Sequence, residues 1–156
     1  MPLTIFSPAF PSGGAIPALY TGEGRDLSPP LVWSGVPAEA KSLVLIVDDP
    51  DAPDPAAPQR VWVHWILYDL PSETLELPEG VSPLPTGTRE GINDWGRPGY
   101  GGPMPPIGRH RYFFKLYALD AVLGPLSTPS KSDLLKAMEG HVLEQAEMIG
   151  TYQKGG

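Results

Sequence analysis

Two histidines and a tyrosine are the side chains of this sequence best placed for chemistry. His110 and Tyr112 begin the stretch 110–119, in which residues alternate between two faces, and they share the face of Phe114. A buried polar side chain left unpaired costs about 1–3 kcal/mol, so both need partners. The pattern predicts either core residues bonded to backbone or the mouth of a pocket beneath the Gly/Pro-rich segment 91–108.

His64 is the other candidate. It stands within Val61–Asp69, which alternation predicts to be a strand with Trp62, His64, Ile66 and Tyr68 on one face and Val61, Val63, Trp65 and Leu67 on the other. A lone histidine in such a strand is usually a satisfied core residue. It gains functional meaning if a carboxylate faces it.

An acidic, proline-rich stretch, 48–55, follows the buried strand expected at Leu43–Val47. A calcium loop counted from Asp49 fails, because Asp54 occupies the glycine position and Arg60 the position of the bidentate glutamate. The stretch therefore reads either as a plain solvated turn or as a functional loop held by the scaffold.

Composition narrows the function classes. The 156 residues include no cysteine, which excludes disulfides, thiol catalysis and thiolate metal sites. The net charge of −7 disfavours nucleic acid and anionic membrane surfaces as partners. No apolar run approaches the ~20 residues of a membrane span, and the first residues lack the pattern of a secretion signal, so we expect a cytoplasmic protein.

Turn residues indicate the fold class. Twenty-one prolines and 18 glycines punctuate short apolar segments, which is typical of a turn-rich β protein. We expect one domain over residues 1–156, mainly β, with an antiparallel β-sandwich and a short C-terminal helical segment. Extended pieces are expected around residues 5–6, 18–20 and 31–34, an irregular crossover at 70–90, and a last strand at 151–152.

The helical segment has its own start signal. Ser130 and Asp133 form a capping-box pattern. Apolar residues then follow at near-helical spacing, and Gly140 could divide the segment into two short helices. These residues are Leu134, Met138, Val142, Ala146 and Ile149.

Three separated motifs carry a family resemblance: Asp-Pro-Asp-Ala-Pro at 49–53, His64, and the segment from Gly102-Pro103 through His110-Arg111-Tyr112. With them, the chain resembles the phosphatidylethanolamine-binding proteins, also called Raf kinase inhibitor proteins, most closely the bacterial and archaeal branch. The stretches 22–53 and 138–152 extend this resemblance over essentially the whole chain. It implies a sandwich of antiparallel sheets with a small helical element.

The resemblance also implies a small anion pocket at one end of the sandwich. There the two imidazoles, the Tyr112 hydroxyl and the Gly102 amide would donate to a phosphate or carboxylate. Asp49 would accept from a ring nitrogen and favour imidazolium, and Trp62 would form an apolar wall. Met104 departs from the proline or cysteine of many relatives, which affects the width of the pocket. The implied lining is Asp49, Trp62, His64, Gly102, Pro103, Met104, His110 and Tyr112.

Three function hypotheses follow. The first is non-enzymatic binding of small anionic, phosphoethanolamine-like groups, with no cofactor and no metal. The second is a metal-dependent hydrolase, since two histidines and Asp49 could also ligate zinc or iron. The third is an inhibitor of proteases or kinases. A homodimer is also expected, because Phe113 and Tyr117 on the outward face need a cover from the C-terminal helix or another subunit, and bacterial relatives are often dimers.

Overall fold

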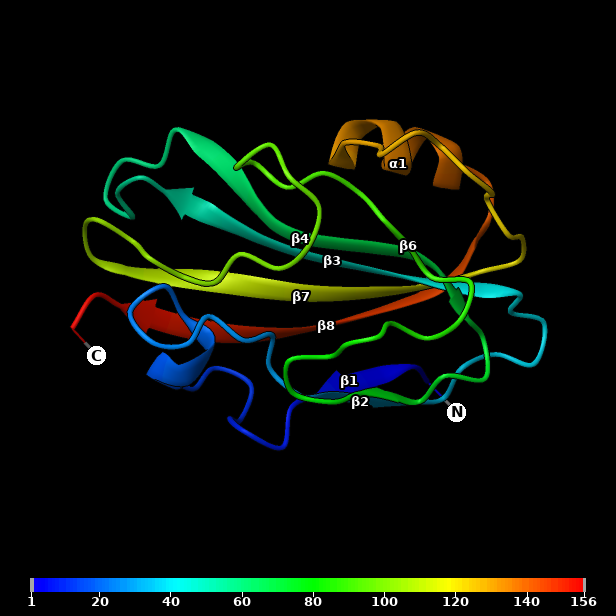
Figure 1. Ribbon diagram of the computed structural model, residues 1–156, viewed down its shortest axis with the longest axis horizontal. Helices are drawn as coiled ribbons and strands as arrows, with labels where there is room; N and C mark the ends of the chain where they lie inside the picture. The colour runs from blue at the N-terminus through cyan, green and yellow to red at the C-terminus, as the bar shows by residue number, and fades with distance from the viewer. Residues whose placement is uncertain (1, 156) are drawn as a thin grey trace.

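A five-stranded antiparallel sheet is the centre of the fold. The computed structural model describes residues 2–155. In this sheet the strands follow the order β6-β4-β3-β7-β8, with β3 and β7 running through its middle (Figure 1). The bounds are β3 (Ser42–Ala52), β4 (Arg60–Pro71), β6 (Arg89–Glu90), β7 (Arg109–Leu119) and β8 (Val142–Gln153).

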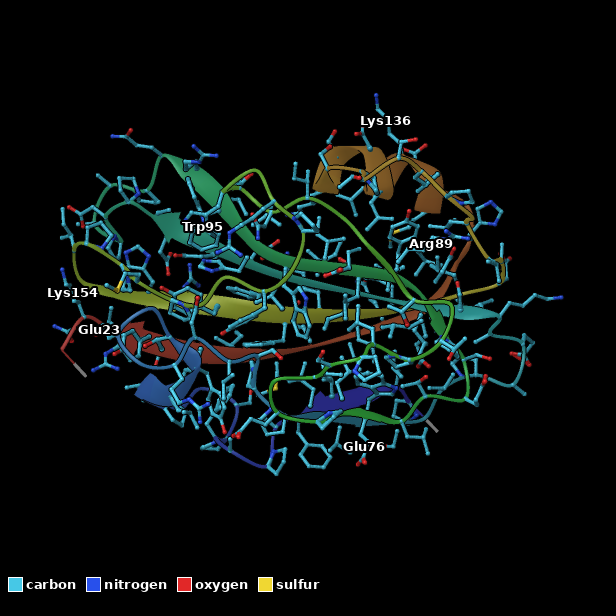
Figure 2. The ribbon with its side chains drawn as sticks, in the orientation of Figure 1. Glu23, Glu76, Arg89, Trp95, Lys136 and Lys154 are labelled. Atoms are coloured by element: carbon cyan, nitrogen blue, oxygen red, sulfur yellow. The ribbon has the colours of Figure 1, made fainter. Side chains whose placement is uncertain are left out.

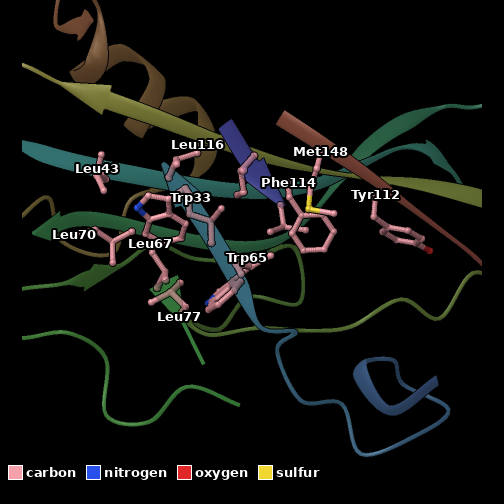
Figure 3. Packing of buried hydrophobic residues seen from close by; sticks show 14 of the residues in the cluster. Trp33, Leu43, Trp65, Leu67, Leu70, Leu77, Tyr112, Phe114, Leu116 and Met148 are labelled. Atoms are coloured by element: carbon pink, nitrogen blue, oxygen red, sulfur yellow. The ribbon is translucent and has the colours of Figure 1, made fainter. Parts of the chain in front are cut away.

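A three-stranded antiparallel sheet packs on one face of the larger one. It consists of β1 (Thr4–Phe6), β2 (Leu31–Ser34) and β5 (Glu76–Leu77), in the order β1-β2-β5. Between the two sheets lies the main hydrophobic core, which includes Trp33, Trp65, Leu67 and Phe114 (Figure 3). The burial of these large apolar side chains is the main stabilising term of the fold.

The helix α1 (Lys131–Met138) covers the opposite face of the larger sheet (Figure 1). Ser130 caps it with the expected capping box, and Leu134 and Met138 pack against Val44 and Ile46 of β3. None of the helices within residues 2–155 has the length and apolar character of a membrane span. The expectation of a mainly β, antiparallel fold with one short helical segment is confirmed.

Strand β3 is buried on both faces, as its continuous apolar run predicts. Leu43 and Leu45 face the main core, whereas Val44 and Ile46 face the helix. The strand continues through the acidic residues as far as Ala52, so Asp48–Asp51 form a strand end. The prediction of a turn or loop at these residues was wrong, because pairing with β4 and β7 supplies their backbone with partners.

Strand β4 contains a register shift that alternation cannot reveal. Val47 pairs with Trp65, but the next residue, Asp48, pairs with Val63. Val63 consequently joins the helix-side cluster, while Trp65 joins the main core. The predicted division of this strand into two alternating faces therefore holds only on either side of the bulge.

Three other local expectations were wrong. Residues 142–150 continue as strand β8, paired with β7 along its length, and do not form a second helix. Residues 18–20 form a 3-10 helix, η1 (Ala18–Tyr20), instead of an extended piece. The crossover at 70–90 contributes β5 and β6 and the last two residues of β4.

Candidate functional site

A cavity of about 440 Å³ opens at the end of the sheet where β3 ends and β4 and β7 begin. Six of the eight predicted site residues line it, namely Asp49, Trp62, His64, Met104, His110 and Tyr112. Further lining comes from Arg60, Trp95, Pro105 and Pro106. Three separate stretches of chain therefore meet around one hollow, as the sequence predicts.

The His64 ring is held from behind by the segment that covers it. Its Nδ1 lies 2.7 Å from the carbonyl oxygen of Gly101, and the Gly101 amide donates back to the His64 carbonyl at 3.0 Å. Trp95 and Tyr112 pack on the ring edge-to-face, with centroids 5.1 Å away in both cases. Burial lowers the pKa of His64 to about 4, so the ring is neutral at pH 7.

Two polar atoms of this lining have no hydrogen-bond partner among residues 2–155. One is Nε2 of His64, and the other is the hydroxyl of Tyr112. Both side chains are nearly inaccessible, at 4% and 1% exposed. Burial raises the pKa of Tyr112, so its hydroxyl keeps its proton and can donate.

His110 is arranged differently from the prediction, because both of its ring nitrogens are already engaged. Nδ1 lies 2.6 Å from Oδ2 of Asp49, and Nε2 lies 2.8 Å and 3.1 Å from the carbonyl oxygens of Ile107 and Pro53. Carbonyl oxygens only accept, so Nε2 carries a proton. Nδ1 faces the Asp49 carboxyl group, so the contacts leave no nitrogen of His110 for a ligand.

Asp49 thus accepts from a ring nitrogen, as the resemblance implies, and also from the Asp51 amide at 2.7 Å. Burial raises the pKa of Asp49, and the hydrogen bond with His110 opposes this shift. Its two neighbouring carboxylates are structural. Asp51 pairs with Arg111 through two oxygens, while Asp48 binds Lys115 and Lys131.

Gly102 and Pro103 lie behind the cavity wall and do not line it. The Gly102 amide, predicted to donate to an anion, instead donates to Asp26 at 2.7 Å. A Cβ at this glycine would come within 2.4 Å of the Tyr20 carbonyl oxygen, which explains the residue type. The carbonyl of Pro103 accepts from the Gly22 amide at 2.9 Å. Both residues therefore anchor the covering segment to the N-terminal part of the chain.

Arg60 and Trp95 were not predicted as site residues. The Arg60 guanidinium lies 4.5 Å from the ring centroid of Trp62, and 3.6 Å from Asp94. Trp95 stacks edge-on against Trp62 at 5.4 Å and lies beside β4 (Figure 2). Arg60 has the same strand parity as Trp62 and His64, which is a signal that could have found it. For Trp95 the only signal was an aromatic residue within a Gly/Pro-rich segment.

A metal-binding arrangement is not formed by the residues that suggested one. Among residues 2–155, no three His, Cys, Asp or Glu side chains are placed to hold a metal ion. The reason is visible at His110, whose two nitrogens both point at oxygen acceptors. The cavity presents one hydroxyl, one ring nitrogen without a protein partner, the Arg60 guanidinium and a mostly apolar wall, which is the usual composition of a small-ligand site.

Comparison with known proteins agrees with this architecture. The chain is 53% identical to a UPF0098 protein of Methanothermobacter thermautotrophicus, over 94% of this chain and 96% of the relative. A crystal structure of a phosphatidylethanolamine-binding protein homologue from Chlamydia trachomatis superposes with a TM-score of 0.91 at 44% identity, covering 98% of both chains. Escherichia coli YbcL gives a TM-score of 0.86 at 31% identity, covering 98% of this chain and 99% of YbcL.

The sequence profile of one family, described as phosphatidylethanolamine-binding protein, matches residues 6–153, nearly the full chain. This match and the two solved structures agree with the mainly β fold and its short helix. The chain belongs to the phosphatidylethanolamine-binding protein family.

Proposed function

We propose that this protein binds a small anionic group, phosphate or a phosphoethanolamine-like headgroup, without transforming it. The observation that carries the proposal is the pair of unpartnered polar atoms in the cavity, Nε2 of His64 and the Tyr112 hydroxyl, both on side chains that are almost fully buried. The only buried side-chain nitrogen or oxygen without a partner among residues 2–155 is Oγ1 of Thr88, so both atoms are open to the cavity, where a ligand with complementary oxygens can reach them.

The shape of the cavity supports an organic substituent on that anion. Trp62, Trp95 and Met104 form an apolar wall beside the two polar atoms. Arg60, stacked on Trp62, adds a cation to the lining, in a protein whose net charge of −7 otherwise repels anions. The family's name, phosphatidylethanolamine-binding protein, points to the same kind of ligand.

A regulatory role toward another protein is the second candidate. It is favoured by apolar side chains that remain exposed around the cavity, Trp95 at 43%, Met104 at 46% and Ile107 at 53%. Exposed apolar residues beside a pocket are typical of interaction sites. A panel of proteases and kinases tests this role directly, and inhibition of none of them at micromolar protein would contradict it.

Ligand binding is tested with a matched pair of substitutions on β7. Tyr112→Phe removes the hydroxyl that faces the cavity, whereas Tyr117→Phe makes the same change on the opposite face of the strand. A hydrogen bond to a charged group contributes about 1.5–3 kcal/mol, so Tyr112→Phe should weaken phosphoethanolamine binding roughly 10- to 100-fold. Tyr117→Phe should bind like the wild type.

Isothermal titration calorimetry with phosphoethanolamine measures all three proteins. Equal affinity of wild type and Tyr112→Phe would remove the hydroxyl from the site. Failure of the wild type to bind phosphoethanolamine or inorganic phosphate at millimolar concentration would overturn the proposed function.

A further inference from the structure

We propose that the cavity selects anions that carry an acidic proton into the site, so that it favours phosphomonoesters over sulfate esters and over phosphodiesters such as an intact phospholipid headgroup. This inference rests on the proposed function and concerns the chemical class of the ligand. It follows from which atoms in the cavity hold protons and which do not.

The tautomer of His64 is fixed by geometry. The carbonyl oxygen of Gly101, 2.7 Å from Nδ1, can only accept, so the ring proton is on Nδ1. In the neutral ring Nε2 is then a bare lone pair. A fully deprotonated oxyanion placed there would set one lone pair against another, whereas a P–OH group would donate to it.

The remaining groups leave Nε2 of His64 without another source of a proton. His110 cannot supply one, because Nε2 of that ring is directed at the carbonyls of Ile107 and Pro53 and Nδ1 at Asp49. The Tyr112 hydroxyl has a proton to donate, which suits an unprotonated ligand oxygen. Nε2 of His64 and the Tyr112 hydroxyl thus offer one acceptor and one donor, complementary to the P–OH and P–O⁻ groups of a singly charged phosphomonoester, while Arg60 in the lining attracts any anion.

The charges around the ring favour a singly charged ligand as well. Asp48 and Asp94 act on His64 from β3 and from the segment after β6, and Asp49 lies in the cavity lining. Opposite them stand Arg60, which pairs with Asp94, and His110, which disfavours the protonated His64 ring. Asp48 and Asp94 favour the protonated ring, but burial outweighs them and lowers the pKa of His64 to about 4. In the free site Nε2 of His64 therefore carries no proton at pH 7.

The proton balance defines the selectivity. A complex of neutral His64 with the phosphomonoester monoanion has the same number of protons as a complex of protonated His64 with the dianion. The two are therefore the same bound state, whichever of the two groups holds the proton. A phosphomonoester loses its second proton near pH ~6. Below that pH it brings the proton itself, and above it one proton must be taken up from solution. Sulfate esters and phosphodiesters have no such proton, and they would bind well only after His64 itself is protonated.

The test compares ligands of one skeleton on the wild-type protein. Phosphoethanolamine and 2-aminoethyl sulfate have the same shape, but only the phosphate has an acidic proton. Glycerophosphoethanolamine is the phosphodiester that matches phosphoethanolamine. Glycerol 3-phosphate, a monoester, controls for the glycerol group of that diester. Calorimetry from pH ~5.5 to ~8.5 in buffers of different ionisation enthalpy gives both affinity and proton uptake. Phosphoethanolamine affinity should be flat below pH ~6 and fall about tenfold per pH unit above pH ~6, with uptake of about one proton per site.

At pH ~7 the sulfate ester and the diester should bind at least about tenfold more weakly than their monoester counterparts. Equal binding of phosphoethanolamine and its sulfate analogue, with no proton uptake, would overturn this inference and leave the proposed function standing. Binding of none of the four would instead overturn the proposed function.

A variant gives an independent reading. Glutamine places an amide near the position of Nε2, and its NH₂ group donates without needing a proton from the ligand. His64→Gln should therefore bind the phosphate and sulfate analogues within a few-fold of each other and lose the pH dependence. Retention of the wild-type pH profile by His64→Gln would contradict the role of this ring. The wild-type titration decides the question even if the variant does not fold.

Discussion

At the scale of single residues, two histidines in one cavity have opposite electrostatic settings. His64 gains one carbonyl partner and loses solvent, so it stays neutral. His110 has an oxygen partner at each ring nitrogen, the carboxyl group of Asp49 at Nδ1 and the carbonyl of Ile107 at Nε2. The difference arises from neighbours supplied by distant parts of the chain. The same residue type therefore leaves one nitrogen open to the cavity in one place and connects two loops in the other.

The buried neutral ring predicts how stability depends on pH. The pKa of His64 is about 4 in the folded protein and ~6.5 in the unfolded chain, so the unfolded state binds more protons between these values. Its contribution to the free energy of unfolding is complete above pH ~6.5 and is lost as the pH falls toward ~4. Between pH ~7.5 and ~4.5 this loss amounts to about 2–3 kcal/mol.

Urea unfolding at these two pH values measures the loss, and His64→Gln is the control that retains the carboxylates titrating in the same range. The wild type should lose about 2–3 kcal/mol more than the variant. An equal loss in the two proteins would mean that His64 is not kept neutral by folding.

The sequence predicts which residues lie at the site better than it predicts which atoms they bond to. The three motifs correctly predict that His64, His110 and Tyr112 approach one another. The engagement of His110 by Ile107 and Pro53, and of the Gly102 amide by Asp26, was not predictable. These contacts depend on the three-dimensional path of loops, for which residue types and spacing give no direct signal.

At the scale of elements, β8 shows why the spacing of apolar residues fails to predict secondary structure where it fits both a helix and a strand. The apolar residues after α1 fit a helical spacing as far as Ile149, yet in the structure Met148, Gly150 and Tyr152 are buried at every second position. The short segment is compatible with both periods, and pairing with β7 selects the strand. Tertiary pairing likewise creates the bulge in β4, for which no local residue is a marker.

The attachment of α1 to the sheet depends on a buried carboxylate. Nζ of Lys131 at the start of the helix lies 2.6 Å from Oδ2 of Asp48, while Lys136 on the same helix projects into solvent (Figure 2). Lys131→Met should lower the free energy of unfolding by about 1–3 kcal/mol, because Asp48 then keeps only Lys115. Lys136→Met should change it by no more than about 0.5 kcal/mol. Urea unfolding compares the two, and equal effects would show that the ion pair does not stabilise the helix.

At the scale of the whole molecule, the outward face of β7 is partly covered by the chain itself. The Phe113 ring lies 5.5 Å from the guanidinium carbon of Arg111 and 5.6 Å from Nζ of Lys115, and Tyr117 packs against the helix-side cluster. The homodimer stays a prediction. Light scattering should give twice the mass of one chain, and a single-chain mass at ~100 µM protein would contradict it.

The engagement of both nitrogens of His110 has a kinetic consequence. This one ring contacts both the loop after β3, through Pro53, and the loop before β7, through Ile107, beside the cavity. Because these contacts hold the two loops in place, ligand binding should need little rearrangement of the protein. The association rate constant should then be similar for all ligands, and differences in affinity should arise from the dissociation rate constant.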